Sequence, residues 1–592
     1  MAKLKDFIIN DLTGGLVLNE SDNVMADNQL KDSLNLEFDE NGKLKRRRGI
    51  VQFGDTKSGI IDESVVFTRQ TLGAAPGTQH LIITRAADGA LYRVFGNYLS
   101  AAINTATVTV PIRNMYADFT GAGNLEINGD IVAYTAQAGA TFTGATGIRA
   151  THPIYSEVHQ ILSLGATGVD TRSGAYFSVL NNLLFINGRT NNATYDGTNI
   201  TTVADTDEPA GIFATNYRNR IYVAGSGATD GAGSRNGSPN RISYCQIGDP
   251  TDWGDYTTDF EIVEDDRGES ITGLKEMNDV LLIFKMNSIF SYDEIQLKQR
   301  LRNVGAYSHK VVQKIGELLY TFCPTGVWVT NGASAQKISD PISKYIENFK
   351  PEFETVTGRV ITNCFAGQFK SNYYLYLHDS TQPAERSDVV LVYDTIKGTW
   401  TVHDTYTNFA HFGSFQTFLT GAPSESTAGG TTAQHGEGFF AGDTGGKYWR
   451  LFENTFLDNE ATRVRHGGDI IPNLVSNSAG TAIQTIAETK FYNIGDEPTQ
   501  LARVRKIAVL VEQGTFQVSY RLDKGTHITD WISLGDFKTT ITERKLKEKE
   551  NIGYRIAFKI TSNTADIITI FNAIILKERE TIEQTKHGIR TN

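Results

Sequence analysis

A short β-hairpin pattern recurs at least seven times along this chain, and it restricts the possible folds more than any other feature. Each copy combines an apolar strand, a tight turn rich in Gly, Asn or Asp, and a second strand rich in aromatic residues. One hairpin cannot bury its apolar face alone, so the series predicts stacked or radially arranged sheets. Most copies start roughly 40 to 60 residues apart, which is the spacing of β-propeller blades. The copies begin at His80, Asn182, Asn219, Asn278, Gly316, Asn372 and Gly436.

We therefore expect an all-β chain in three parts. An N-terminal strand segment covers residues 1–60, and a β-propeller of about six or seven blades covers 61–480. An Ala/Gly/Thr-rich stretch at about 101–165 interrupts the hairpin series, and we interpret it as an inserted β-element with too few large apolar residues for a core. Longer strands with strict alternation of apolar and polar residues predict a C-terminal β-sandwich over 481–592.

Two smaller features complete the expected fold. Early and late strands should together close the propeller, because closure protects sheet edges that an open array exposes. A short amphipathic helix is predicted from Asp340 to Phe349, with Asp340 as its N-cap and Pro341 at the first helical position. The Gly/Ser-rich loop at 225–240 and the inserted element are expected to form contacts or to gate a channel.

Composition argues against several classes of function. A net charge of −11 with 40% hydrophobic residues describes an ordered chain and not a generic nucleic-acid binder. The N-terminus lacks the apolar stretch of a signal peptide, and no apolar run is long enough to span a bilayer. We expect synthesis in a cytoplasm, no stable membrane insertion, and three buried cysteines in a reducing compartment: Cys245, Cys323 and Cys364.

No pattern of residues predicts catalysis, a metal or a cofactor. The 11 histidines show no metal-ligand spacing, and no nucleophile elbow occurs. Residues 442–447 resemble a phosphate loop but are one residue short, and a hairpin turn explains them fully. Asp249, Asp252 and Asp255 could bind a cation, although turn formation is the commoner use of such residues. We expect no enzymatic activity.

The strongest local charge feature is a basic run that follows a predicted turn. On a strand its side chains alternate between the two faces, so it could grip DNA phosphates or an acidic partner surface. A charged edge strand that deters unwanted pairing is an equally good interpretation. The candidate partner-contact residues are Lys43, Lys45, Arg46, Arg47 and Arg48.

A set of motifs is spread over roughly residues 10 to 350. Those near the N-terminus are Gly14-Gly15-Leu16, Asn35, Phe38-Asp39, Gly42 and Arg48-Gly49, and further stretches are residues 247–255, 288–294 and 326–349. In these motifs the chain resembles the tail nozzle and tail-tube completion proteins of podoviruses, which are short-tailed bacteriophages. No collagen-like or coiled-coil repeat is visible, which separates the chain from receptor-binding fibres and spikes.

The resemblance implies a structural virion protein of the tail. It would form a homo-oligomeric ring, in family terms a hexamer, attached through an adaptor (head-completion) protein to the portal and in contact with tail fibres or spikes. The ring would enclose the DNA channel, retain the genome and serve in its ejection, without sequence recognition of the DNA. Two alternatives stay open: a carbohydrate-binding or depolymerising propeller, and a kelch-like interaction scaffold.

Overall fold

The computed structural model describes most of the chain. Its described residues are 3–38, 43–57, 59–68, 79–85, 90–112, 121–127, 130–154, 156–166, 176–188, 191–209, 211–225, 238–255, 258–265, 267–353, 363–378, 388–404, 409–415, 438–451, 457–458, 465–466, 469–470, 481–538, 543–547, 551–562 and 570–582.

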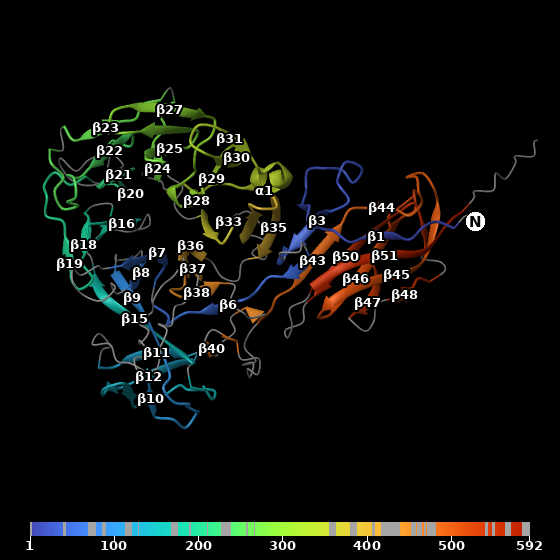
Figure 1. Cartoon of the computed structure of the whole chain (residues 1–592), viewed down its shortest axis with the longest axis horizontal. Coiled ribbons are helices and arrows are strands. Elements are labelled where there is room, and N and C mark those ends of the chain that lie inside the picture. The colour runs from blue at the N-terminus through green and yellow to red at the C-terminus, as the bar shows by residue number, and fades with distance from the viewer. Residues whose placement is uncertain are drawn as a thin grey trace, which may run out of the picture.

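The described residues form a β-propeller of seven blades, each an antiparallel unit of four strands (Figure 1). The first strand of each blade lies innermost, and the inner strands of neighbouring blades contact one another around the ring. The short helical turn η2 (His309–Val311) contacts the inner strands of both the fourth and the sixth blade. The last inner strand contacts the first, so the ring is closed. The predicted all-β propeller is confirmed, with seven blades.

The strands follow the chain from blade to blade. Blades one to three are β7 (Ile61–Thr68), β8 (Gln79–Arg85), β9 (Ala90–Tyr98) and β15 (Glu157–Ala166); β16 (Tyr176–Leu180), β17 (Leu183–Asn187), β18 (Ala193–Tyr195) and β19 (Ile200–Thr202); and β20 (Phe213–Tyr217), β21 (Arg220–Ala224), β22 (Arg241–Tyr244) and β23 (Phe260–Ile262). Blades four and five are β24 (Ile271–Met277), β25 (Val280–Lys285), β26 (Ser288–Tyr292) and β27 (Leu297–Arg302); and β28 (Gln313–Ile315), β29 (Leu318–Cys323), β30 (Gly326–Thr330) and β31 (Ala335–Lys337). Blades six and seven are β32 (Cys364–Phe369), β33 (Asn372–His378), β34 (Asp388–Asp394) and β35 (Thr399–Asp404); and β36 (Phe409–Phe415), β37 (Gly438–Asp443), β38 (Tyr448–Leu451) and β6 (Ile50–Gln52).

The seven hairpins found in the sequence are the second and third strands of the seven blades. The inner strand joins the second strand through a two-residue turn in several blades, and both turn residues then have positive φ. Asn181-Asn182 and Asn278-Asp279 are such turns, with φ between 47° and 64°. Asn and Asp tolerate this left-handed conformation, which matches the twist of a tight hairpin. The inner strand itself carries no comparable sequence signal.

An N-terminal strand closes the ring, as predicted. Strand β6 pairs antiparallel with β38 and is the outer strand of the seventh blade, with Ile50 opposite Leu451. Closure therefore joins residues about 400 positions apart in the sequence. The predicted propeller boundary at 480 is wrong, because the last blade ends at Leu451. Two small hairpins follow: β39 (Leu457–Asp458) with β42 (Thr481–Ala482), and β40 (Arg465–His466) with β41 (Asp469–Ile470).

The inserted element has a core of its own, which corrects the expectation from its composition. It lies between the third and fourth strands of blade one and packs Leu125, Ile127, Val132 and Phe142 with their neighbours into a separate cluster. Small side chains leave enough room for these few large ones to be fully enclosed. The element ends before β15, so it covers fewer residues than 101–165. Its strands are β10 (Thr109–Pro111), β11 (Gly123–Ile127), β12 (Asp130–Tyr134), β13 (Ala136–Gln137) and β14 (Thr141–Thr143).

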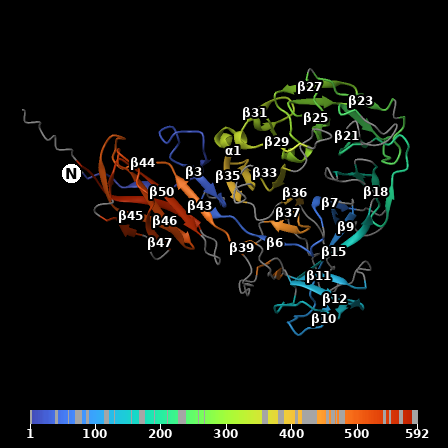
Figure 2. The ribbon, with the colours of Figure 1, turned by 180° about the vertical axis from the view of Figure 1, so that it is seen from behind.

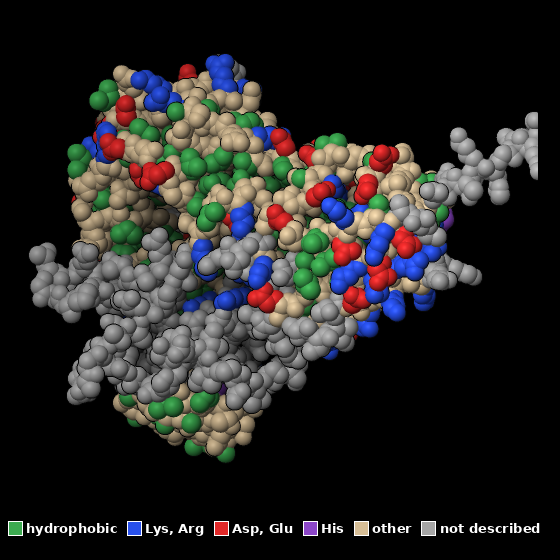
Figure 3. All heavy atoms as spheres, turned by 45° about the vertical axis from the view of Figure 1, so that its right-hand side comes forward, with side chains coloured by type: hydrophobic (Ala, Val, Ile, Leu, Met, Phe, Trp, Pro, Cys, Tyr) green, Lys and Arg blue, Asp and Glu red, His purple; other side chains and the backbone are tan. Residues whose placement is uncertain are grey.

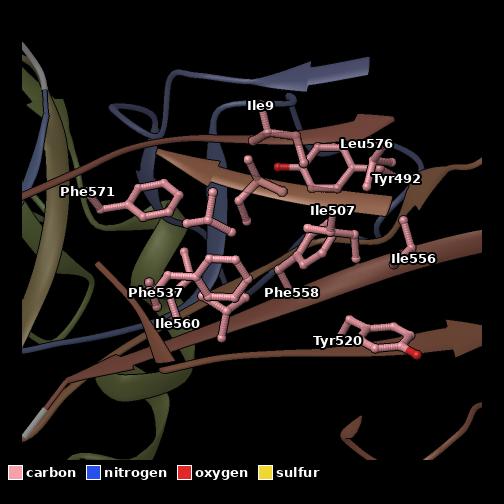
Figure 4. Packing of buried hydrophobic residues seen from close by; sticks show 14 of the residues in the cluster. Ile9, Tyr492, Ile507, Tyr520, Phe537, Ile556, Phe558, Ile560, Phe571 and Leu576 are labelled. Atoms are coloured by element: carbon pink, nitrogen blue, oxygen red, sulfur yellow. The ribbon is translucent and has the colours of Figure 1, made fainter. Parts of the chain in front are cut away.

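The C-terminal region forms two packed sheets, but N-terminal strands belong to both. One sheet has the order β4-β5-β51-β45-β48, and the other continues from β3 through β43, β50 and β46 to β47. Figure 4 shows the apolar residues between them, among them Ile507, Phe558 and Leu576. Residues 1–60 are thus not a separate domain. The strands are β1 (Phe7–Ile9), β2 (Gly15–Leu16), β3 (Gln29–Leu34), β4 (Leu36–Phe38), β5 (Leu44–Arg46), β43 (Thr485–Thr489), β44 (Tyr492–Asn493), β45 (Ala502–Gln513), β46 (Phe516–Asp523), β47 (Ile532–Phe537), β48 (Glu543–Lys545), β49 (Ile552–Gly553), β50 (Arg555–Ser562) and β51 (Ile570–Thr581).

Propeller and sandwich share one continuous sheet. Strand β35 of blade six pairs with β3, and β3 pairs on its other side with β43 of the sandwich. Figure 2 shows the two bodies side by side, with β3 and β35 at the join. Because backbone hydrogen bonds cross the boundary, we expect the two bodies to move as one unit.

The predicted helix is present with a different start. A single 3₁₀ turn, η3 (Asp340–Ile342), runs into α1 (Ser343–Asn348). Asp340 lies inside the turn and Ser339 precedes it, so the predicted N-cap is wrong, while Pro341 occupies one of the first helical positions as expected. No helix in the described part of the chain is long and apolar enough to cross a membrane.

Candidate functional site in the propeller channel

A cavity lies where the inner strands of the propeller converge. It has a volume of about 620 Å³ and takes side chains from β7, β16, β24, β28, β32 and β36, together with η2. Strands far apart in the sequence therefore build one site, as expected for the centre of a propeller (Figure 1). Its polar lining residues are Glu63, Ser64, Lys275, His309, Lys310, Gln313, His411 and Ser414.

Glu63 and two lysines form the charged centre of the cavity. The Lys310 Nζ atom lies 4.0 Å from the Glu63 carboxylate and donates a 2.7 Å hydrogen bond to the Asp62 carbonyl. The side chain of Glu63 is 17% exposed and that of Lys310 is 10% exposed. Burial raises the pKa of Glu63 to about 7, although Lys310 and Lys275 oppose the shift. The pKa of Lys275 is lowered, chiefly by burial.

His411 and Ser64 form a hydrogen-bonded pair on neighbouring inner strands. The Nε2 atom of His411 lies 2.9 Å from the Ser64 hydroxyl, and its Nδ1 atom lies 3.1 Å from the Ile61 carbonyl. Because a carbonyl only accepts, Nδ1 carries the proton in the neutral ring and Nε2 accepts from Ser64. Burial lowers the pKa of His411 to about 3. The hydroxyl and imidazole are hydrogen-bonded as in a serine nucleophile with its general base. An imidazole with this pKa is, however, a weak base at neutral pH.

His309 is also neutral and fixed in orientation. Its Nδ1 atom accepts a 3.2 Å hydrogen bond from the Leu274 backbone amide, so Nε2 carries the ring proton. The ring stacks on Phe213, with 5.7 Å between centroids. Burial, with smaller contributions from Lys275 and Lys310, lowers the pKa of His309 to about 3. This ring offers the cavity a hydrogen-bond donor and no charge.

The basic run proposed as a contact surface is mostly part of the architecture. Arg46 is 1% exposed and Arg47 is 0% exposed, so these two guanidinium groups cannot reach a partner, and we correct their assignment. Lys43 and Lys45 form ion pairs with Glu512 and Glu37, respectively. Arg48 alone among the five is exposed.

Arg47 holds the side chain of Asn35, and Asn35 connects the N-terminal segment with the sandwich. The Nε atom of Arg47 donates a 2.8 Å hydrogen bond to the side chain of Asn35, and its Nη1 donates a 3.0 Å bond to the Arg48 carbonyl. Asn35 is buried with φ of 56°, and its amide donates to the Gln484 carbonyl. Burial and the nearby Arg47 charge hold the pKa of His403 on β35 well below its usual range. The basic run therefore stabilises the joint between the two bodies.

The other motifs singled out in the sequence are turns. Asp443 accepts backbone hydrogen bonds from Gly445 and Lys447 and one from the Trp449 indole, so residues 442–447 form the predicted hairpin turn between β37 and β38. Asp249 likewise accepts from the backbone two residues ahead. No group of His, Cys, Asp or Glu side chains suited to a metal ion occurs among the described residues.

The cysteines agree with the prediction, whereas residues 543–545 form a strand where the mixed charges indicate a solvated connection between strands. All three cysteines are buried free thiols, as predicted. The charged run from Glu543 begins as edge strand β48, where Glu543 pairs with Lys506 and Lys577. Figure 3 shows basic and acidic side chains interspersed over this part of the surface. The loop predicted at 225–240 lies largely outside the described residues.

No protein-family model matches this chain, and no curated protein matches its sequence. Among solved structures, BamB from Moraxella catarrhalis aligns over 69% of this chain and 100% of its own, with 8% identity and a TM-score of 0.31. The Pan2 WD40 domain from Neurospora crassa aligns over 61% of this chain and 90% of its own, with 11% identity and a TM-score of 0.26. Likeness at this level carries no functional argument, and the fold assignment rests on the sheet topology.

Sequence reasoning missed the channel cluster. Its charged members come from β7, β24 and η2, and each has a polar or charged neighbour in the sequence, so none is distinguished from an ordinary surface residue. One signal was available: Glu63 and Lys275 both lie in the strand that precedes a copy of the hairpin pattern. That position marks an inner strand only once the blades have been aligned.

Proposed function

We propose that this chain is a structural protein of a short bacteriophage tail. It assembles as a ring of six copies at the distal end of the tail, below an adaptor protein. DNA passes through the ring without sequence recognition, and fibres or spikes attach around it. The proposal starts from the podovirus resemblance, which covers roughly residues 10 to 350.

One observation supports the proposal more than any other: two separated stretches of that resemblance meet in space. The Gly14-Gly15-Leu16 motif lies against the helical segment at 338–349, because Leu18 donates a 2.8 Å backbone hydrogen bond to Pro341. Leu16 and Ile342 belong to one buried cluster, together with Trp400. Residues that match the family therefore build the joint between propeller and sandwich. Such a joint suits a rigid building block that has to keep its shape in a ring.

The charge of the chain is consistent with a channel through which DNA slides. Each lysine or arginine on a channel wall would add a phosphate contact that retards the duplex. The net charge of −11 favours a neutral or acidic channel wall. Such a wall would repel the DNA phosphates over about one Debye length, which is roughly 8 to 10 Å. Arg48 is the remaining exposed member of the basic run, and we assign it to the contact with the adaptor.

Sedimentation analysis of the purified full-length chain tests the proposal. A hexamer of 65.1 kDa subunits has a mass of about 390 kDa, six times that of one chain. We expect this species at micromolar concentration. A monomer at all accessible concentrations, with tight binding of a polysaccharide, would instead favour the carbohydrate-binding alternative.

A further inference from the structure

We propose that the cavity at the centre of the propeller binds a small organic anion. The carboxylate or phosphate group of the anion pairs with Lys275 and Lys310, and its apolar part packs on neighbouring phenylalanine rings. This site is independent of the proposed role in a phage tail. It lies on the inner strands of a single chain, so it does not depend on a ring of several copies.

The size and lining of the cavity suit such a ligand. A volume of about 620 Å³ lies within the usual range for small-molecule sites. Phe177, Phe365 and Phe412 contribute aromatic surface, and the last two rings pack edge to face with 5.0 Å between their centroids. Ligand sites combine apolar surface with fixed polar groups, and in this cavity the polar groups supply the larger share of the lining.

Positive groups outnumber negative ones in the lining of the cavity. Two ammonium groups, on Lys275 and Lys310, and one carboxylate, on Glu63, line it, while Asp62, Glu276 and Lys314 act on these groups from outside the lining. Lys310 is already held by the Asp62 carbonyl and by Glu63. Burial of an ammonium group is unfavourable unless an opposite charge compensates it, and burial is the largest cause of the lowered pKa of Lys275. A bound carboxylate or phosphate would add a negative partner for Lys275.

Protonation of Glu63 should tune the affinity. Below a pH of about 7 its carboxyl is neutral and two positive charges remain, whereas above that pH its negative charge competes with the ligand. The charged groups that act on Glu63 are Lys310, Lys275 and Asp62. His309 and His411 line the same cavity and stay neutral over this range, because both have a pKa of about 3. An anion should therefore bind more tightly at pH 6 than at pH 8.

Isothermal titration calorimetry on the full-length chain tests the site. The probes are benzoate, glucuronate and inorganic phosphate, with benzyl alcohol as the uncharged counterpart of benzoate. We expect at least one organic anion to bind with one-to-one stoichiometry and no binding of benzyl alcohol. Phosphate binding as tight as that of the organic anions would show that the apolar lining contributes nothing and would overturn that part of the proposal.

Matched variants assign the binding to the cavity. Lys275→Met should weaken the anion about tenfold or more, and Lys275→Arg should retain it. Lys337→Met is the control, because Lys337 on the outer strand β31 pairs with Asp340 and does not line the cavity. No anion binding at millimolar concentration, or equal affinities for wild type and a folded Lys275→Met, would overturn the proposal. If Lys275→Met does not fold, equal affinities of wild type at pH 6 and pH 8 would overturn it instead.

Discussion

Replacing Arg47 by Met should destabilise the protein strongly, although the residue belongs to a basic run that resembles a surface feature. The substitution keeps an apolar stem of similar length and removes the guanidinium group. That group donates to the Asn35 side chain and to the Arg48 carbonyl. Hydrogen bonds from a charged donor contribute about 1.5 kcal/mol or more each, so the two predict a loss of about 3 kcal/mol in the free energy of unfolding.

The same substitution at the next position provides the control. Arg48 is exposed, so Arg48→Met should change the free energy of unfolding by about 0.5 kcal/mol or less. Urea unfolding followed by tryptophan fluorescence measures both variants, and the buried Trp400 near the joint reports on this region. Equal effects of the two substitutions would refute the assignment of Arg47 to the joint and restore the basic run as a surface feature.

Three further predictions test the closure, the joint and the channel. Ile50→Ala should lower the free energy of unfolding by about 3 kcal/mol, measured with urea, because Ile50 is fully buried on the closing strand. Gln52→Ala on the same strand should lower it much less. Equal losses for the two variants would contradict closure by β6. Gly15→Ala should lower the melting temperature more than Gly139→Ala. Both glycines have positive φ, but a Cβ atom at Gly15 would lie 2.8 Å from the Trp400 carbonyl oxygen, whereas one at Gly139 would have no atom within 4 Å. Similar melting shifts for the two variants would argue against the tight joint. Glu63 has a pKa of about 7 in the folded chain and 4.5 as its ordinary value, so its contribution to stability is lost as pH rises through this window. The stability of Glu63→Gln relative to wild type should therefore rise by about 3 kcal/mol between pH 5 and pH 8. A difference in the free energy of unfolding that stays constant over this pH range would contradict the raised pKa of a buried carboxyl.

Local sequence signals predicted the blades because each hairpin is a local structure. Apolar alternation and the turns at Asn181-Asn182 and Asn278-Asp279 depend on neighbouring residues alone, so one sequence is enough to find them. The inner strands were harder to find, since polar residues such as Glu63 and Lys275 interrupt their apolar pattern. Their assignment depends on the ring, which local reasoning does not contain.

Pairings between distant segments could not be predicted from residue patterns. Strand β5 pairs with β51 across more than 500 residues, and this pairing turns a basic run into part of the sandwich. Charge alone predicts exposure for Arg46 and Arg47, whereas the folded chain buries both side chains. The cavity shows the same limit, because Glu63, Lys275 and His411 meet only when the ring closes.

Electron microscopy of the purified full-length chain tests the proposed tail function most directly. We predict rings with sixfold symmetry and an open central channel, in which every subunit consists of a seven-bladed disc joined to a smaller sandwich. Class averages that contain only single propellers with one attached sandwich, at micromolar concentration, would contradict a structural role in the tail.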